Sequence, residues 1–479
     1  MLFEIKTIKI IFKKRRIGVK MKKKILGLGL GAVVAGVTLA SLTSCTPSDV
    51  FHIYAWNTEF QGFFNKYLTD ENKDKADADK VLDKEWYHLD GKAVKWTIVP
   101  SDDGQYQQAL DQALADNANA GTSEKVDMFL AEADYILKYT NSNATKDIST
   151  IGANITSNIY QYTKEAASDA NGKVKGVSFQ CCPAGVIYRR SIAEDLWGAG
   201  NGTPEYVQSK IDTWDKFNAV AADMKAKGYL MTSSFAETYR AFSNNTSMPW
   251  VDANKNLQLD DQIDTWMDQA ELFNENDYSL TAGIWDDECT ACMYKDGDSQ
   301  GRKAFCYFGP AWYYNFCMTN AQDEKKGCSG DWGLVEGPAK YFWGGTWMLA
   351  ATGGDDDALV KKTMEAFTND ENICYQLVTK EGQFSNNQVV NKKVSDEYDS
   401  KCTGNKFLGG QNDTKVYLEL AKGIKFQNQT IYDQYCNEGL QNKFAEYLKG
   451  TVTKEQAIAN FKEYIKTKCP DVVTTNFTI

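Results

Sequence analysis

Histidine is almost absent from this chain of 479 residues, which contains only His52 and His88. Chemistry that needs several imidazoles is therefore excluded, including histidine-rich zinc sites and most Ser-His-Asp triads. The chain also lacks a glycine-rich phosphate loop, and it shows no internal repeat with a period of about 20–50 residues. We expect neither a metal ion nor a cofactor.

Basic charge is scarce beyond the first 44 residues. Residues 1–44 hold ten of the 53 Lys and Arg side chains and one acid, Glu4. The rest of the chain has 43 basic and 63 acidic side chains, a net charge of −20. A body this acidic repels phosphate backbones, so we expect no nucleic-acid partner. The hydrophobic content of 43% favours a folded chain with a sizeable core.

The beginning of the chain has the pattern of an export signal. Met21 and three lysines precede residues 25–42, which carry no charge, and Leu42-Thr43-Ser44-Cys45 resembles a bacterial lipobox. We interpret residues 1–44 as a signal peptide with an upstream extension, removed before Cys45, which then receives a lipid such as palmitate. The alternative is a permanent membrane helix over 25–42. The first interpretation predicts a protein anchored by lipid on the extracytoplasmic face of the cell membrane.

Eleven cysteines follow Cys45, and an exported location permits disulfide bonds between them. The sequence does not determine their pairing. Cys289-Thr290-Ala291-Cys292 is a single CxxC motif without a second motif or a nearby histidine. It is at most half of a zinc site, so we favour a disulfide or free thiols there.

The hydrophobic pattern predicts an α/β fold. Apolar strands at 51–55, 93–99 and 126–131 alternate with helical segments, an order typical of a parallel, doubly wound sheet. We interpret residues 70–92 as a solvated helix and loop. Further elements are predicted as strands at 174–179, 185–188 and 304–308, helices at 214–228, 260–275 and 358–367, and a last helix behind the capping box Thr453–Gln456.

Ligands of open α/β sheets lie beyond the carboxyl ends of the strands. Aromatic and planar polar residues follow the predicted strands at Trp56, Asn57, Glu59, Asp134, Gln180, Trp312 and Tyr313, and Trp343 and Trp347 flank Gly344-Gly345. An aromatic ring buries the apolar face of a pyranose, and planar Asp, Asn, Glu and Gln groups bind its hydroxyls. These residues therefore predict a carbohydrate site, with core packing as the alternative for each tryptophan.

The same residues carry a resemblance to a known family. Five segments after the lipobox carry it: IYAWNTEFQGFF (53–64), VDMFLAEADYI (126–136), GVIYRR (185–190), FGPAWYYNF (308–316) and GDWGLVEGPAKYFWGGTWMLAA (330–351). They resemble the carbohydrate-binding lipoproteins of bacterial ABC transporters, which are maltose-binding-like extracellular solute-binding proteins. Two departures stand out. Cys181-Cys182 occupies a loop that often offers a polar contact in this family, and Ala311 separates Pro310 from Trp312.

The resemblance implies two lobes, each a mostly parallel sheet flanked by helices, that close on a ligand about a hinge. Lobe 1 would comprise 45–182 and about 350–400, and lobe 2 about 183–349 and about 401–479. The chain would cross between them near 180–185 and again near 346–351. The resemblance places Trp56, Asn57, Glu59 and Asp134 on lobe 1, Trp312 and Tyr313 on lobe 2, and Trp343 and Trp347 beside the hinge.

We therefore expect a non-catalytic, monomeric, lipid-anchored protein that captures a carbohydrate, such as an oligosaccharide, and delivers it to the permease subunits of an ABC importer. One alternative is the same fold with a peptide or polyamine ligand, which Glu59, Glu132 and Asp134 would suit. The other is a lipid-anchored glycoside hydrolase that uses two carboxylates, for which the runs at 286–288 and 355–357 supply acids, although such runs are more typical of solvated loops.

Overall fold

The computed structural model of the protein describes residues 47–477. The predicted signal peptide and Cys45 lie outside the described residues. Residues Asp49–Ile479 form one compact unit that contains two β-sheets. Within the described part, no helix is both long enough and apolar enough to cross a lipid bilayer.

The first sheet has six strands in the order β2-β3-β1-β4-β11-β5. Their bounds are β1 (Val50–Ala55), β2 (Tyr87–Leu89), β3 (Lys92–Ile98), β4 (Met128–Glu132), β5 (Gly176–Ser178) and β11 (Thr346–Ala350). β1 runs parallel to both β3 and β4, and all of its residues except Tyr54 are buried. Such a continuous apolar run is typical of a central strand covered on both faces.

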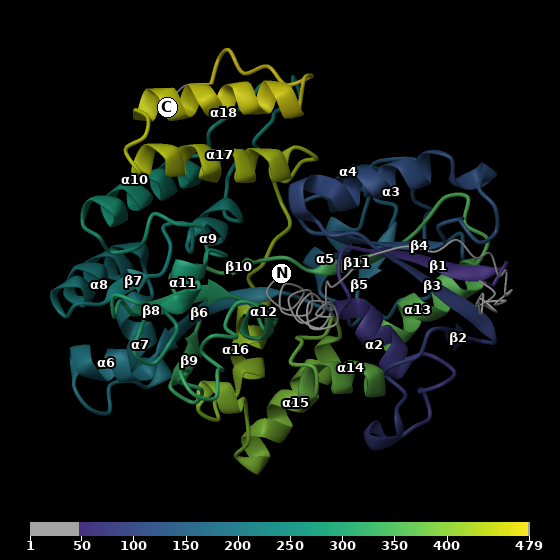
Figure 1. The fold of residues 1–479 in the computed structure, drawn as a ribbon, viewed down its shortest axis with the longest axis horizontal. Helices are drawn as coiled ribbons and strands as arrows, with labels where there is room; N and C mark the ends of the chain where they lie inside the picture. Colours follow the sequence, from purple (N-terminus) through teal and green to yellow (C-terminus); the bar gives the residue numbers. More distant parts are fainter. Residues whose placement is uncertain (1–46, 478–479) are drawn as a thin grey trace, which may run out of the picture. The chain divides into compact units, whose positions relative to one another are not determined.

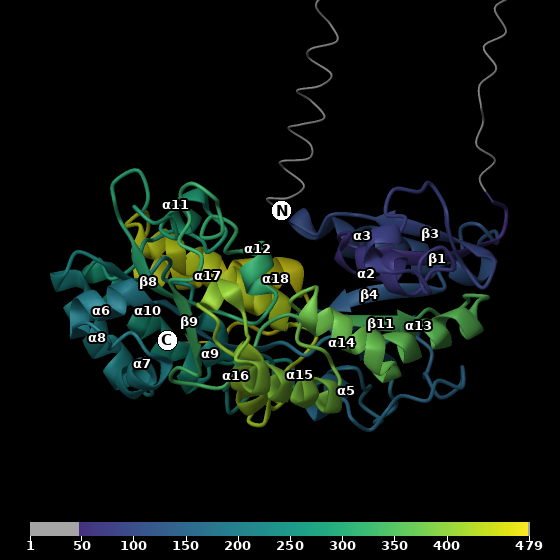
Figure 2. The same ribbon diagram turned by 90° about the horizontal axis from the view of Figure 1, so that it is seen from below.

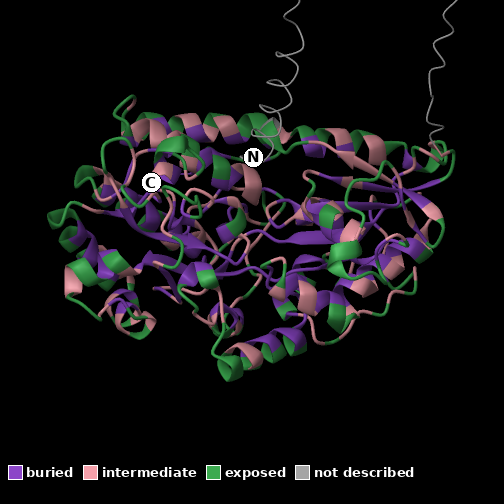
Figure 3. Cartoon of the chain, turned by 60° about the horizontal axis from the view of Figure 1, so that its bottom comes forward, coloured by how far each residue is buried: buried purple, intermediate pink, exposed green. Residues whose placement is uncertain are grey.

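The second sheet is built around β6, which pairs with β8 along one edge and with β9 and β10 along the other. Its strands are β6 (Pro183–Arg189), β7 (Leu230–Thr232), β8 (Ala304–Gly309), β9 (Trp332–Val335) and β10 (Tyr341–Phe342). We call each sheet with the helices packed on it a lobe, the first lobe and the second lobe. Figures 1 and 2 show the two sheets, and Figure 3 shows that the strands are mostly buried.

The two-lobed α/β architecture is confirmed, but the expectation of mostly parallel sheets is wrong. In the first sheet β11 runs antiparallel to β4 and β5, because the chain returns from the second lobe in the opposite direction. In the second sheet only β7 and β8 are parallel. The segment predicted as a solvated helix and loop contains β2, which pairs with β3 through a tight turn at Asp90 (φ 51°) and Gly91 (φ 80°). This Asp-Gly dipeptide is a strong hairpin signal.

Helices cover both faces of each sheet. In the first lobe α2 and α13 pack on one face of the sheet and α3 and α4 on the other (Figure 1). The helices associated with this lobe are α2 (Glu59–Tyr67), α3 (Gln105–Ala115), α4 (Ile136–Thr140), α5 (Gln161–Ala166), α13 (Asp357–Asn369), α14 (Glu371–Thr379) and α15 (Gln388–Lys401).

In the second lobe α6, α7 and α8 pack on one face of the sheet, and α16 packs against β6 from the other. A separate apolar cluster joins α9, α10, α17 and α18 (Figure 1). The helices are α6 (Arg190–Trp197), α7 (Pro204–Ile211), α8 (Trp214–Ala226), α9 (Tyr239–Ser243), α10 (Asp261–Glu275), α11 (Asp287–Ala291), α12 (Tyr313–Phe316), α16 (Asp413–Ala421), α17 (Asp433–Leu448) and α18 (Lys454–Lys468).

Local capping explains where several of these helices begin. The Thr453 hydroxyl accepts a hydrogen bond from the Gln456 backbone N–H at 3.2 Å, as the predicted cap requires. The Asp260 carboxylate does the same for α10. By contrast, α3 begins after Gly104 (φ 74°), with no side-chain cap.

The chain crosses between the two sheets twice. The first crossing joins β5 to β6, and the second joins β10 to β11 through Trp343, Gly344 and Gly345. The second crossing therefore precedes the predicted range 346–351, since Thr346 already pairs within the first sheet. The two glycines have φ of 72° and 117°, values that residues with a side chain rarely adopt. The extents of the lobes elsewhere in the chain stay a prediction.

Candidate functional site

A narrow polar pocket lies where the two lobes meet. Its walls are the loop after β4, helix α9, the start of α17 with the loop before it, and the second crossing. The lining residues are Ala133, Asp134, Leu137, Arg240, Ser243, Asn244, Phe342, Gly344, Gln429, Thr430, Asp433 and Asn437. Its free volume is about 20 Å³, room for about one water molecule. A larger ligand therefore enters only when the lobes separate.

An ion pair joins the lobes across this pocket. The two terminal nitrogens of Arg240, on α9, each donate to one oxygen of Asp134, after β4, both at 2.5 Å. Burial opposes the charge of Arg240, but the Asp134 carboxylate outweighs it and raises the pKa of the guanidinium. A second contact runs from the Gln107 amide to Gln434 Oε1 at 2.8 Å. The structure thus shows the lobes held together by polar groups that a ligand is able to replace.

Within residues 47–477, no basic side chain bonds to three carboxylates near the pocket. Burial, followed by the charge of Asp134, raises the pKa of Glu132 to about 8. Burial also raises the pKa of Glu59 and that of Asp433 to about 7. Glu59 and Glu132 both act electrostatically on the buried thiol of Cys182, in the first crossing, and help to raise its pKa after burial and Cys181.

Each of these carboxylates accepts hydrogen bonds from uncharged donors. Glu132 Oε2 accepts from the Asp134 backbone N–H at 2.7 Å, and Glu59 Oε1 accepts from the Gln383 amide at 3.0 Å. Asp433 Oδ1 accepts from the backbone N–H and the hydroxyl of Thr430, at 2.8 and 2.6 Å. These bonds do not neutralise the charge, so the site is acidic when the carboxylates ionise.

Three tryptophans, Trp285, Trp312 and Trp343, form what we call the aromatic cluster. The rings of Trp312 and Trp343 meet edge to face at 5.1 Å, and the Trp312 indole N–H donates to the Trp343 carbonyl at 3.1 Å. Trp285 lies 6.0 Å from Trp343 and is 50% exposed, unusual for so large an apolar ring. A Cβ on Gly344 would lie 3.4 Å from Trp312 and 3.5 Å from Glu132 Oε1. The cluster therefore adjoins the carboxylates and the pocket.

Trp56 and Asn57 lie on the first lobe at the end of β1. The Trp56 ring packs edge to face against Tyr106 at 5.7 Å and stays half-buried. The Asn57 side-chain oxygen accepts from the backbone N–H of Glu59 at 3.0 Å and so orients the start of α2. Asn57 therefore helps to place the Glu59 carboxylate.

Three of the predicted site residues lie in the core. Trp347 is fully buried, and its indole N–H donates to the Thr163 carbonyl at 2.8 Å. Tyr313 and Gln180 are 1% and 4% exposed. These three side chains are buried, and their contact with a ligand stays a prediction. Local patterning misses this because a strand followed by an aromatic residue looks the same whether the ring faces a cleft or a core.

Arg240, Trp285 and Asp433 belong to the site, but the sequence alone does not single them out. Arg240 and Asp433 lie in helical segments without a distinctive pattern, and only the packing of α9 and α17 brings them to Asp134. Trp285 does carry a signal, since it stands between Gly283 and two aspartates, the setting in which a tryptophan is poorly placed for a core.

All eleven cysteines of the described residues are free thiols. The CxxC motif is buried, and burial raises the pKa of the Cys292 thiol to about 12. Among the residues that the structure describes, no group of His, Cys, Asp and Glu has the arrangement of a metal site.

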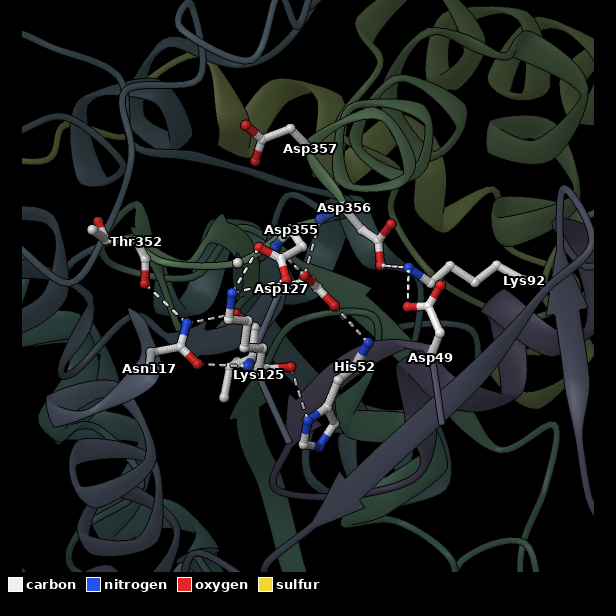
Figure 4. Close-up of polar contacts among 12 residues, drawn as sticks. Asp49, His52, Lys92, Asn117, Lys125, Asp127, Thr352, Asp355, Asp356 and Asp357 are labelled. Atoms are coloured by element: carbon white, nitrogen blue, oxygen red, sulfur yellow. Dashed lines mark hydrogen bonds and ion pairs between the residues drawn. The ribbon is translucent and has the colours of Figure 1, made fainter. Parts of the chain in front are cut away.

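The acidic run at 355–357 lies in a partly solvated loop, where Asp355 is 50% exposed, and it joins a polar network at the opposite end of β4. Figure 4 shows Asp127 at its centre, where its carboxylate accepts from three backbone N–H groups, those of His52, Asp355 and Asp356, at 2.9, 2.8 and 3.1 Å. The run is also ion-paired: its three carboxylates contact Lys125, Lys92 and Lys146 in turn. These acids tie β1 and β4 to the start of α13.

A wider hollow lies elsewhere, between the 68–80 segment and helices α13 and α14. It is lined by lysines and acids, and several lysines are paired, as in Lys380–Asp77 and Lys362–Asp90. Apart from Tyr67 it presents no aromatic ring, so it lacks the face that a sugar ring needs.

Comparisons with known proteins agree with this architecture. Residues 88–401 match the family model described as bacterial extracellular solute-binding protein, and the chain belongs to that family. No curated protein matches the sequence. Among solved structures, an extracellular solute-binding protein of family 1 has a TM-score of 0.65 at 18% identity, over 88% of this chain and 99% of that one.

Two further structures were solved with sugars. The ABC transporter-associated binding protein of Bifidobacterium animalis subsp. lactis, in complex with β-1,6-galactobiose, has a TM-score of 0.62 at 14% identity over 88% of this chain and 98% of that one. The galacto-N-biose/lacto-N-biose I-binding protein of Bifidobacterium longum, in complex with lacto-N-biose, has a TM-score of 0.59 at 14% identity, over 88% of this chain and 97% of that one. At such identities the likeness shows the fold alone.

Proposed function

We propose that this protein captures a carbohydrate between its two lobes and delivers it to the permease of an ABC importer. The observation that carries the proposal is the aromatic cluster beside the Asp134–Arg240 pair at the second crossing. Aromatic faces suit the C–H face of a pyranose, and the surrounding carboxylates and amides suit its hydroxyls. The sugar complexes of proteins with the same fold add support.

Sugar binding would proceed through an open form. The ligand would first dock on one lobe, and closure would then bring Arg240 toward Asp134 and bury the sugar between them. Only the closed form would present both lobes to a permease, so the ligand shifts an equilibrium between two states.

The proposal includes a lipid anchor at Cys45 on the extracytoplasmic face of the cell membrane. Replacing Cys45 with Ser is expected to move the protein from the membrane fraction to the soluble fraction, because no lipid is then attached. Retention of the variant in the membrane would point instead to a membrane helix over 25–42.

Thermal unfolding of the chain from residue 46 onward tests the ligand, because a ligand that binds only the folded state raises the midpoint. The panel contains mono- and oligosaccharides, a dipeptide mixture and spermidine. A rise with one class of saccharide supports the proposal. A rise only with peptide or spermidine would keep the family and overturn the carbohydrate.

A polyamine or peptide ligand is the second candidate, favoured by the acidic character of the pocket. A glycoside hydrolase is the third. Its candidate acids at 355–357 are engaged in the network around Asp127. Release of product from a chromogenic glycoside would support the hydrolase.

A further inference from the structure

The interlobe pocket has an excess of negative charge. Arg240 is the only basic side chain that lines it within residues 47–477, and both of its terminal nitrogens already bind Asp134. Asp433 lines the pocket as well, and Glu132 lies at its edge beside Gly344. The Asp134–Arg240 pair acts electrostatically on both Asp433 and Glu132. A carboxylate buried without a cation is unfavourable in its charged form.

The protein keeps these carboxylates despite that cost. Burial raises the pKa of Glu132 to about 8 and that of Asp433 to about 7, so both hold a proton for part of the time near neutral pH. A neutral ligand would leave the ionised carboxylates without a counter-charge, whereas a cationic group would take the place of the protons.

A second, independent observation points to a ligand that also carries acceptors. Asn437 lines the pocket and is only 6% exposed. Its side-chain oxygen accepts from the Tyr239 hydroxyl at 2.6 Å and from the Trp250 indole N–H at 2.9 Å. These two donors fix the orientation of the amide, so its NH₂ group is the end left for the pocket, and it has no partner among the described residues. The Ser243 hydroxyl, in the same wall, is buried without a partner.

These features separate the possible ligand classes. A polyamine offers donors only, so the Asn437 NH₂ group would stay without an acceptor. A neutral sugar offers acceptors but leaves Glu132 and Asp433 without a cation. A sugar with an amino group satisfies both requirements, and its ring still suits the aromatic cluster.

We infer that the ligand is a carbohydrate that carries a primary amine, whose ammonium group binds between the carboxylates of Glu132 and Asp433 while Asn437 donates to a ring hydroxyl. The inference rests on the proposed function and names its substrate class.

Matched sugars that differ at one carbon test it. Isothermal titration at pH 7 compares glucose, glucosamine and N-acetylglucosamine, the corresponding galactose and mannose series, and the β-1,4-linked tetramers of the three glucose-based units. An amine-bearing member is expected to bind at least about tenfold more tightly than its hydroxyl and acetamide counterparts, because hydrogen bonds between charged groups are the strong ones. The inference is overturned if any neutral saccharide of the full panel binds more tightly than every amine-bearing one.

Variants assign the effect to the pocket. Glu132→Gln and Asp433→Asn are each expected to remove most of the preference for the amine and to change the affinity for the hydroxyl counterpart by less than about threefold. Glu463→Gln, at a carboxylate on α18 that is 70% exposed and paired with Lys466, serves as the control and should keep the preference. An amine preference that survives in both pocket variants contradicts the assignment.

The same titrations distinguish failure of the inference from failure of the proposed function. Binding of neutral saccharides without an amine preference overturns the inference alone. Binding of no saccharide at all, together with binding of spermidine or peptide, overturns the carbohydrate itself and the inference with it.

Discussion

The two ends of β4 bury carboxylates in opposite ways. At the amino end, Asp127 accepts from three backbone N–H groups and is 3% exposed (Figure 4). At the carboxyl end, Glu132 accepts from the backbone of Asp134, and its neighbours are the Asp134–Arg240 pair and the aromatic cluster. The Asp127 carboxylate finds its hydrogen-bond donors within its own lobe. The Glu132 carboxylate lies where the other lobe meets the first and where we propose that the ligand binds.

This difference follows from the direction of the strands. The carboxyl ends of β1 and β4 lie at the same edge of the sheet because the two strands are parallel, and that edge is where α/β proteins bind ligands. The amino ends lie at the opposite edge, where the start of α13 covers them. A polar residue at one edge therefore acts on stability and at the other on binding.

Trp347 tests how far the functional edge extends. It pairs with Ala131 near the carboxyl end of β4, yet its ring is fully buried. We expect Trp347→Ala to lower the free energy of unfolding by about 4 kcal/mol, because a large cavity replaces the ring. Urea unfolding measures the loss. A stable variant with weakened ligand binding would return Trp347 to the site.

Asp127→Ala tests the structural end. Three backbone N–H groups, one of them in a fully buried contact, lose their acceptor, so the free energy of unfolding should fall by about 3 kcal/mol. Asp127→Asn keeps one carbonyl acceptor and should lose less. Both variants should keep the affinity for the ligand when assayed well below their melting temperatures, and a selective loss of affinity would contradict the division between the two ends of β4.

The pH dependence of stability should differ in sign between Glu132 and His52. The pKa of Glu132 rises from about 4.5 to about 8 on folding, so the folded state binds more protons between these values. Its contribution to stability is full below about pH 4.5 and is lost as the pH rises toward 8. In the unaltered chain, Glu132 should make the free energy of unfolding fall by about 3 kcal/mol between pH 5 and pH 8. Glu132→Gln should abolish this fall, and urea unfolding at the two pH values measures it.

His52, in the network around Asp127, has the opposite sign. Burial, followed by the charge of Lys95, lowers its pKa from 6.5 to about 4. His52 therefore contributes about 3 kcal/mol to the free energy of unfolding above pH 6.5, and this contribution is lost as the pH falls toward 4. If Glu132→Gln alters the acid side of the stability profile instead of the alkaline side, the assignment of the two groups is wrong.

Trp312→Ala tests the functional end with the smallest expected change. Loss of the half-buried ring should weaken ligand binding by about 2 kcal/mol through the lost apolar contact. Tyr206→Ala, at a half-buried tyrosine on α7 that does not line the pocket, is the control. Isothermal titration with the saccharide identified by the panel measures both, and equal affinities for Trp312→Ala and the unaltered chain would remove the aromatic cluster from the site.

Part of this site is visible in the sequence. The strand at 51–55 and the one ending near 131 are continuous apolar runs, so the residues that follow them, from Trp56 to Glu59 and at Asp134, were expected at a ligand edge. The same reasoning failed for Trp347, whose strand comes from the second crossing and is covered on both faces. It also had no means to find Arg240 or Asp433, since their positions depend on how α9 and α17 pack.

The sequence by itself determined the local features: the export pattern, the apolar strands, the cap at Thr453 and the α/β class, because each depends on residues close together in the chain. Only the tertiary structure decided the direction of β11, the burial of Trp347, the network around Asp127 and the meeting of Asp134 with Arg240. These contacts join residues far apart in the chain, and their energies depend on packing and desolvation, which no local pattern records.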